Sequence, residues 1–175
     1  MKSGIIVMSE LRGPVAERLR RIQQQYDPRM AAELPPHVTI AGSSGMGPIP
    51  AHTTDARLRD ALEGVARDTA PVVVRFAPPM RFMQSNVVVL PIDPHGPIRA
   101  LHERIKTSGL EFESPRFTFT PHLTLSFYPE LSRGRLRELL RIRVEDAVVL
   151  DAVQAYRATP TGSSARVLDL PLTGH

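Results

Sequence analysis

The chain contains one short pattern twice, Pro36-His37-Val38-Thr39-Ile40 (motif 1) and Pro121-His122-Leu123-Thr124-Leu125 (motif 2). Each copy is Pro-His, a branched apolar residue, Thr and a second branched apolar residue. The two histidines stand 85 residues apart, and so do the two threonines. Because both pairs share one spacing, the sequence indicates two copies of a small unit, each supplying one imidazole and one hydroxyl.

Both motifs are expected to form β-strands. A proline has no N–H, which suits the first residue of a strand, and it biases the residue before it towards extended backbone. The branched residues that follow each histidine favour a strand. Because residues i and i+2 of a strand share a face, each histidine lies beside its threonine, and the apolar residues lie opposite. Each motif therefore has a polar face for a ligand and an apolar face for a core.

The composition is that of an ordinary soluble protein, with 42% hydrophobic and 23% charged residues in a chain of 175. We expect a single domain over residues 1–175 with a core that needs no cross-links. Cysteine is absent, which excludes disulfides, thiol nucleophiles and cysteine metal ligands. The apolar run near the N-terminus is too short for a signal peptide, and no run reaches transmembrane length. We therefore expect a cytoplasmic protein that does not enter a membrane.

The net charge of +4 comes almost entirely from arginine, since Lys2 and Lys106 are the only lysines. An arginine-rich surface is compatible with a phosphate-bearing substrate, and is also found on ordinary solvated surfaces. No dense basic run indicates binding to a nucleic-acid duplex.

Apolar periodicity and turn residues predict alternating strands and helices. We expect helices over residues 14–26, from Thr53 or Thr54 to about 68, from 93 or 94 to just before Gly109, and over 132–140. We expect strands over 5–9, 37–41, 72–76, 86–92, 122–128, 144–156 and 166–172, with a short one between 77 and 85. The glycine-rich segment 42–48, near motif 1, is expected to be a flexible surface loop, with a place at the edge of the cleft as the alternative. It lacks the Lys and Ser/Thr of a phosphate-binding P-loop.

Each motif strand follows a strand and a helix, residues 5–26 before motif 1 and 86–108 before motif 2. This repetition predicts an α+β fold of two pseudo-symmetric lobes of antiparallel sheet, with helices on the outside. The two motif strands are expected to meet at a central cleft.

Two histidines in one cleft suit general acid–base catalysis on a phosphodiester. A neutral imidazole takes a proton from the nucleophile and a protonated one gives a proton to the leaving oxygen, each role being worth about 10²–10⁴ in rate. The hydroxyls of Thr39 and Thr124 can hold the phosphate oxygens between the imidazoles of His37 and His122. No step requires a metal or a cofactor, and none is expected.

Three residues near motif 2 are further candidates for substrate contact. Tyr128 falls on the polar face if strand alternation continues past the motif. Arg116 and Phe119 precede the motif, where a cation can bind a phosphate and a ring can stack on a base. Packing in the core or on the surface is the alternative for Tyr128 and Phe119. His95 and His102 have no third ligand in the pattern, so we expect surface histidines and no metal site.

The doubled motif resembles the two-histidine phosphoesterase superfamily, which includes bacterial 2'-5' RNA ligase-like proteins and phosphodiesterases acting on 2',3'-cyclic phosphates. Its defining feature is two His-x-Thr/Ser-x motifs with x apolar, one in each lobe of a pseudo-symmetric α+β fold. Both motifs are complete in this chain. The likeness extends to the opening strand and helix and to a closing hairpin that ends at 168–172. The resemblance implies that His37 and His122 are the acid–base pair and that Thr39 and Thr124 bind phosphate.

Two departures count against the ligase subfamily. Its members often carry a basic residue soon after motif 2, where this chain has Ser126-Phe127-Tyr128, and motif 1 here runs into a Gly/Ser loop. We expect a metal-independent phosphodiesterase that hydrolyses a 2',3'-cyclic phosphate, or a related cyclic or 2'-5' phosphodiester, on a nucleotide or RNA terminus. The alternatives are a nucleotide or RNA-end binding module with weak turnover, and a 2'-5' RNA ligase. A monomer is expected.

Overall fold

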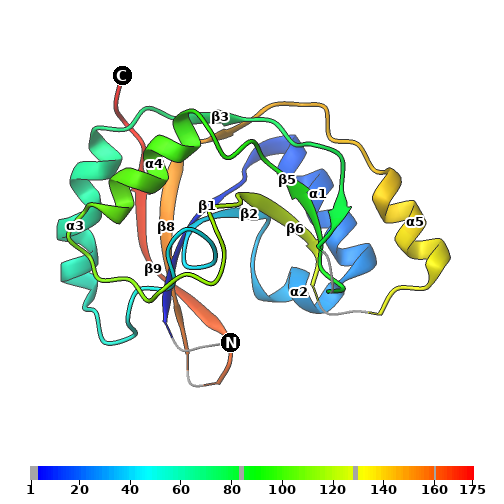
Figure 1. Ribbon diagram of the computed structural model, residues 1–175, viewed down its shortest axis with the longest axis horizontal. Helices are drawn as coiled ribbons and strands as arrows, with labels where there is room; N and C mark the ends of the chain where they lie inside the picture. The colour runs from blue at the N-terminus through cyan, green and yellow to red at the C-terminus, as the bar shows by residue number, and fades with distance from the viewer. Residues whose placement is uncertain (1–3, 83–84, 128–129, 160) are drawn as a thin grey trace.

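The computed structural model describes residues 4–82, 85–127, 130–159 and 161–175 (Figure 1). The helices are α1 (Gly13–Tyr26), α2 (Pro28–Glu33), α3 (Asp55–Arg67), α4 (Pro97–Lys106) and α5 (Arg133–Arg141). The strands are β1 (Ile5–Glu10), β2 (His37–Ala41), β3 (Val72–Val74), β4 (Met80–Arg81), β5 (Val88–Pro91), β6 (His122–Ser126), β7 (Val148–Leu150), β8 (Ala152–Ala158) and β9 (Ser164–Pro171). They form three antiparallel sheets with the orders β2-β1-β8-β9, β4-β5-β6 and β3-β7.

The expected α+β architecture of two lobes is confirmed. Strands β2 and β6, which carry the two motifs, lie in contact at the centre of the molecule, with α3 and α4 towards one end and α1 and α5 towards the other (Figure 1). None of the helices within the described ranges is long and apolar enough to cross a membrane.

The repeat extends to the strand register. Each motif strand pairs with the strand that opens its lobe, and each pair carries a bulge at the same place, where one motif residue is skipped. The matched pairs are His37 with Glu10, Thr39 with Met8 and Ala41 with Val7 in one lobe, and His122 with Pro91, Thr124 with Val89 and Ser126 with Val88 in the other. A bulge bends and twists a strand. The same bend in both lobes therefore presents both His-Thr faces in the same way.

Each motif strand rests on the helix of the other lobe. Helix α1 packs on β6, and Nε2 of Gln23 donates a hydrogen bond to the Thr124 carbonyl at 2.8 Å. Helix α4 packs on β2, and Nδ1 of His102 bonds to the Ile40 carbonyl at 2.7 Å. The apolar faces of both motifs are buried as expected, because Val38, Ile40, Leu123 and Leu125 are at most 1% exposed.

Side-chain caps mark the starts of α3 and α5. The Thr54 hydroxyl accepts from the Arg57 N–H at 3.2 Å at the start of α3, and the Ser132 hydroxyl accepts from the Arg135 N–H at 3.3 Å at the start of α5, as expected. Helix α4 begins later than predicted. The Asp93 carboxylate accepts from the His95 N–H at 3.0 Å, which forms a turn before the helix.

Three expectations about segments need correction. Helix α2 was not predicted, although Asp27 caps it by accepting from the Met30 N–H at 3.1 Å and a proline follows directly. The strand expected over 144–156 is two strands, β7 and β8, which belong to different sheets. Strand β6 ends at Ser126, because the N–H of Phe127 donates to the Asp27 carboxylate at 2.7 Å. Tyr128 lies outside the described residues.

The glycine-rich segment 42–48 is packed, contrary to the expectation of a flexible surface loop. The N–H of Gly45 donates to the Phe117 carbonyl at 2.8 Å, and the N–H of Gly47 donates to the Glu113 carbonyl at 2.9 Å. His102, expected on the surface, is 1% exposed beneath this segment. Its ring stacks on Phe119, with 3.8 Å between the ring centroids. The segment therefore closes over a buried His-Phe pair that connects β2 to the approach to β6.

Candidate active site

The polar faces of the two motifs meet at a cleft of about 370 Å³. The two motif histidines and two motif threonines all line it. Residues from α2, from segment 42–48 and from the chain before motif 2 complete the lining. The lining includes His37, Thr39, His122, Thr124, Glu33, Glu113, Arg116, Phe127 and Tyr156. The structure thus brings both halves of the predicted constellation to one cavity.

The two imidazoles are held by the same hydrogen bond. Nδ1 of His37 bonds to the Pro35 carbonyl at 2.7 Å, and Nδ1 of His122 bonds to the Thr120 carbonyl at 2.7 Å. In each case the acceptor lies two residues earlier, across the proline that opens the motif. Because a carbonyl only accepts, this partner assigns the proton to Nδ1 and leaves Nε2 to exchange a proton.

Burial lowers the pKa of both histidines below the ordinary value of 6.5. The backbone hydrogen bonds act in the opposite direction, and the Glu10 carboxylate also raises the pKa of His37. The charge of a protonated His122 lowers the pKa of His37 further. A proton on one imidazole therefore disfavours a proton on the other, which suits a pair that holds one proton between them.

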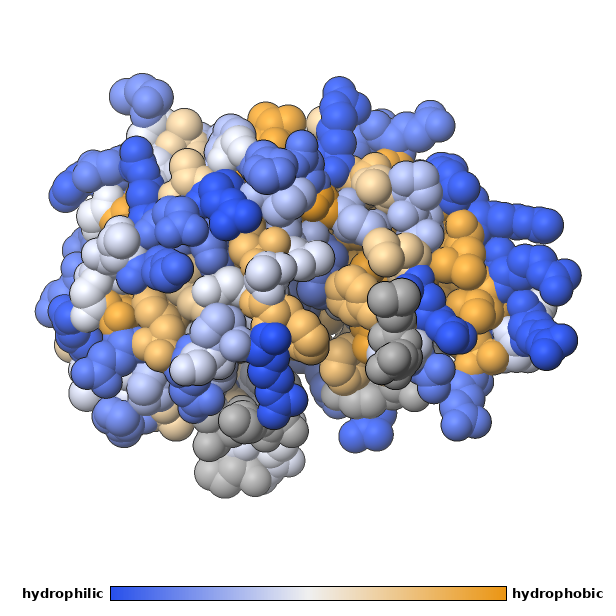
Figure 2. Space-filling view, in the orientation of Figure 1, coloured by the Kyte–Doolittle hydropathy of each residue, from blue (hydrophilic) through white to orange (hydrophobic). Residues whose placement is uncertain are grey.

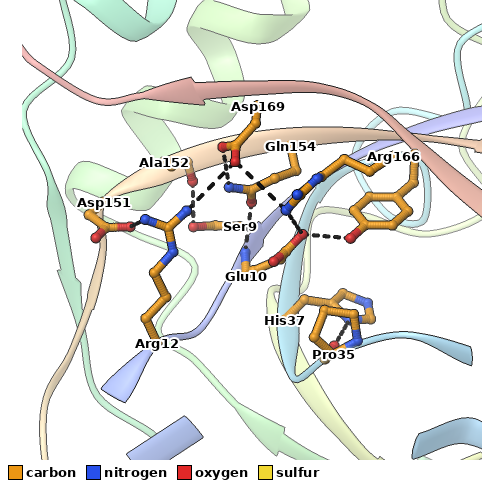
Figure 3. Close-up of polar contacts among 11 residues, drawn as sticks. Ser9, Glu10, Arg12, Pro35, His37, Asp151, Ala152, Gln154, Arg166 and Asp169 are labelled. Carbon is orange, nitrogen blue, oxygen red and sulfur yellow. Dashed lines mark hydrogen bonds and ion pairs between the residues drawn. The ribbon is translucent and has the colours of Figure 1, made fainter. Parts of the chain in front are cut away.

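The surroundings of His37 are polar and charged (Figure 3). Glu10 is its cross-strand partner, and Oε1 of Glu10 accepts from the Tyr156 hydroxyl at 2.6 Å and from Arg166 at 3.3 Å. Burial and the nearby Glu10 carboxylate raise the pKa of Tyr156 to about 12, so the phenol stays protonated. Tyr156 itself lines the cleft.

The surroundings of His122 are apolar. Pro91 takes the position that Glu10 has in the other lobe, and Val89 is the partner of Thr124. The ring of Phe82 meets the His122 ring edge-on, with 5.1 Å between the centroids. The pseudo-symmetry of the backbone is therefore broken in the charges that surround the two imidazoles.

The structure brings most of the predicted site residues to the cleft. His37, Thr39, His122, Thr124 and Arg116 line it. Phe119 does not: it is 5% exposed and packs between His102 and the Arg99 guanidinium, which lies 5.2 Å from its ring centroid. The core alternative therefore holds for that ring. The described ranges contain no group of three or more His, Asp or Glu side chains placed to hold a metal ion.

Sequence reasoning missed Glu10, Tyr156 and Phe127. Phe127 is 50% exposed, lines the cleft and directly follows β6. The end of the motif strand was the signal that could have indicated it, because the first residue beyond a strand often turns into a site. Glu10 and Tyr156 are separated by 146 residues and carry no local pattern.

Comparison with known proteins agrees with this geometry. The model of the 2'-5' RNA ligase superfamily matches residues 11–154, a range that holds both motifs. A "Putative phosphoesterase" of Bacillus pumilus (strain SAFR-032) is 28% identical over 128 residues, covering 72% of this chain and 70% of that one. A similarly named protein of Geobacillus kaustophilus (strain HTA426) is 28% identical over 129 residues, covering 71% and 68%.

The fold is that of LigT from E. coli. The structure of LigT complexed with 3'-AMP superposes with a TM-score of 0.62 at 14% identity, and the complex with ATP with a TM-score of 0.55 at 15% identity. Each comparison covers 98% of both chains. With two matched His-x-Thr strands at one cleft, a shared fold and a family match over most of its length, this chain belongs to the 2'-5' RNA ligase superfamily.

Proposed function

We propose that this chain is a metal-independent phosphodiesterase that hydrolyses a 2',3'-cyclic phosphate, or a related cyclic or 2'-5' phosphodiester, on a nucleotide or RNA terminus. One observation carries the proposal: two imidazoles with the same tautomer-setting hydrogen bond line one cleft, each beside a threonine hydroxyl. Such a pair supplies a base and an acid on two sides of one phosphorus.

The reaction would run through the two Nε2 atoms. A neutral imidazole takes a proton from water as the water oxygen bonds to phosphorus. The protonated imidazole gives its proton to the ribose oxygen as the phosphorus bond to that oxygen breaks. The hydroxyls of Thr39 and Thr124 hydrogen-bond the two non-bridging oxygens and hold the phosphorus between the rings. The product is a phosphomonoester, and proton exchange with solvent restores the starting state.

The broken symmetry makes the surroundings of the two imidazoles unequal. A carboxylate near an imidazole favours its protonated form, and Glu10 is the cross-strand partner of His37. The corresponding position beside His122 is Pro91, and the Phe82 ring packs on the imidazole. Such surroundings favour the neutral form. Burial, the largest effect on His37, and the charge of a protonated His122 both lower the pKa of His37, whereas Glu10 raises it, so the pH profile of the Glu10 variant decides which imidazole is the acid.

The nucleotide around the phosphate would use the remaining lining. The Arg116 guanidinium is exposed at the cleft and suits a phosphate oxygen. The exposed ring of Phe127 suits a nucleobase face. Tyr128 remains a predicted contact. LigT, which shares the fold, has been crystallised with 3'-AMP, ATP and NADP+, which supports a nucleotide as the occupant of this cleft.

The test is turnover of nucleoside 2',3'-cyclic phosphates in excess chelator, followed by phosphorus NMR. We expect conversion to one monophosphate isomer, and a loss of about 10²–10⁴ in kcat for His37→Ala and for His122→Ala. His95→Ala is the matched control, because His95 is an exposed histidine outside the cleft. Full activity in both motif variants would contradict the mechanism. Nucleotide binding with no product would favour the binding-module alternative.

A further inference from the structure

Positive charge gathers on two neighbouring helices. Helices α1 and α5, with Arg143 just beyond α5, carry eight arginines and two glutamates, a formal charge of +6. The whole chain has a charge of only +4, so the rest is net negative. We call these arginines the α1–α5 arginine surface: Arg18, Arg20, Arg21, Arg133, Arg135, Arg137, Arg141 and Arg143. Hydrophilic side chains project from the edge of the molecule where α5 lies (Figure 2).

In the part of the chain that the structure describes, these arginines form no ion pairs with acidic residues. All eight arginines are exposed, and within the described ranges none of them forms an ion pair. Other arginines of the described residues do form ion pairs: Arg12, Arg29, Arg67, Arg99, Arg157 and Arg166. An array of unpaired like charges repels itself, and a bound polyanion relieves that repulsion.

The two helices run in opposite directions and are linked by two side-chain hydrogen bonds. At one end Nη2 of Arg135 donates to the Gln25 carbonyl at 2.6 Å, and its guanidinium lies 5.0 Å from the centroid of the Tyr26 ring. Further back along α1, in its second turn, Nη2 of Arg18 donates to the Arg143 carbonyl at 2.9 Å. The 14 residues of α1 span about 21 Å, the length of about six phosphates of a stacked strand.

The surface reaches the rim of the cleft. Helix α1 ends at Tyr26, and the next residue, Asp27, accepts a hydrogen bond at 2.7 Å from the N–H of Phe127, which lines the cleft. Helix α2 follows at once and contributes Met30 and Glu33 to the lining. A nucleic-acid strand whose last nucleotide occupies the cleft can therefore continue over this rim onto α1 and α5.

We infer that the α1–α5 arginine surface binds the phosphodiester backbone of a single-stranded RNA whose terminus occupies the cleft. The inference rests on the proposed function only for the position of the reacting end. Arginine forks bind phosphate oxygens without regard to base sequence, so this contact adds affinity for long substrates and no sequence preference.

An anionic membrane is the other polyanion to consider, and the side chains disfavour it. Helices that lie in a membrane interface present large apolar residues to the lipid. In the part of the chain that the structure describes, the exposed large apolar residues all lie off these two helices: Val73, Met80, Phe117, Phe127 and Val149.

The experiment measures binding rather than turnover. A labelled RNA of about twelve nucleotides with a plain 3'-hydroxyl is titrated with the full chain at several salt concentrations and read by fluorescence anisotropy. In Arg137→Gln/Arg141→Gln, the slope of log K against log salt should fall in magnitude by about 1.4, and affinity at 0.1 M salt should fall by about 25-fold.

The matched control removes the same charge from the other end of the molecule. Arg59 on α3 and Lys106 on α4 are exposed and form no ion pair within the residues described. Arg59→Gln/Lys106→Gln should keep the slope of the parent chain. Unfolding midpoints of both double variants confirm that each is folded before titration.

Three outcomes would overturn the inference. One is an equal loss in both double variants, which would make the effect one of net charge. Another is an unchanged slope in Arg137→Gln/Arg141→Gln. The third is absence of RNA binding in a chain that binds phosphatidylserine vesicles. Failure of the proposed function is distinguishable, because cyclic phosphates would then persist while the RNA titration behaves as expected.

Discussion

Replacing Gly45 with alanine tests whether segment 42–48 positions the active site. Gly45 has φ +73°, a left-handed conformation that strains residues other than glycine. A Cβ there would lie 2.5 Å from Nε2 of His102 and 2.8 Å from Cβ of Phe119. Neither can withdraw freely, because His102 is bonded to the Ile40 carbonyl and stacked on Phe119.

The magnitude follows from these two terms. The positive φ costs about 1–2 kcal/mol, and forcing an extra methyl group into a packed core costs about 1–3 kcal/mol. The free energy of unfolding should therefore fall by about 3 kcal/mol, which lowers the unfolding midpoint of a chain of this size by about 6–12 °C. Activity should fall as well, because His102 bonds to Ile40, which follows Thr39, and Phe119 lies three residues before His122.

Gly162→Ala is the matched control. Gly162 has φ +84° in the turn between β8 and β9, and a Cβ there would meet no atom within 4 Å. It should lose only the cost of the left-handed conformation, about 1–2 kcal/mol or about 2–8 °C. Calorimetry and cyclic-phosphate turnover of both variants check the argument. Equal loss of stability in the two variants would refute it, because the packing of segment 42–48 would then contribute nothing.

The remaining predictions concern charge and substrate contact. Glu10→Gln should lower the pKa of His37, since the Glu10 carboxylate raises it, and should move to lower pH the limb of the kcat/KM profile that reports His37: the alkaline limb if His37 is the acid, the acidic limb if it is the base. Two unmoved limbs would contradict a role for His37 in proton transfer. Burial lowers the pKa of the two active-site histidines and of His102 below 6.5, so the unfolded chain binds more protons than the folded one below that pH. Stability should therefore be complete above pH 6.5 and decline on acidification, as urea titrations near pH 7.5 and pH 5.5 would show; equal stability at both would contradict the burial argument. Phe127→Ala should weaken nucleotide binding by about 1–3 kcal/mol, seen as a raised KM with little change in kcat. Phe117→Ala, at another exposed ring that does not line the cleft, is its control, and equal KM changes would contradict base stacking.

Features encoded within a few residues could be predicted from the sequence alone. The two motifs determined two strands with a polar and an apolar face, because alternation along a strand depends only on spacing. The hydroxyls of Thr54 and Ser132 marked helix starts because a capping hydroxyl bonds an N–H only three residues away, which is also local in sequence. The strand–helix–strand repeat, visible as residue types in order, determined the two-lobed architecture.

Only the tertiary structure decided the surroundings of each imidazole. Glu10 beside His37 and Pro91 beside His122 follow from strand register, and Tyr156 reaches Glu10 from 146 residues away. The same applies to Phe119, which looks like a base-stacking residue in sequence and packs on His102 in the core. Periodicity specifies which face of a segment is buried, whereas the neighbours on that face depend on how distant segments pack. The sequence by itself therefore determined a pair of His-Thr strands, and strand register within each lobe decided that the surroundings of the two imidazoles differ in charge.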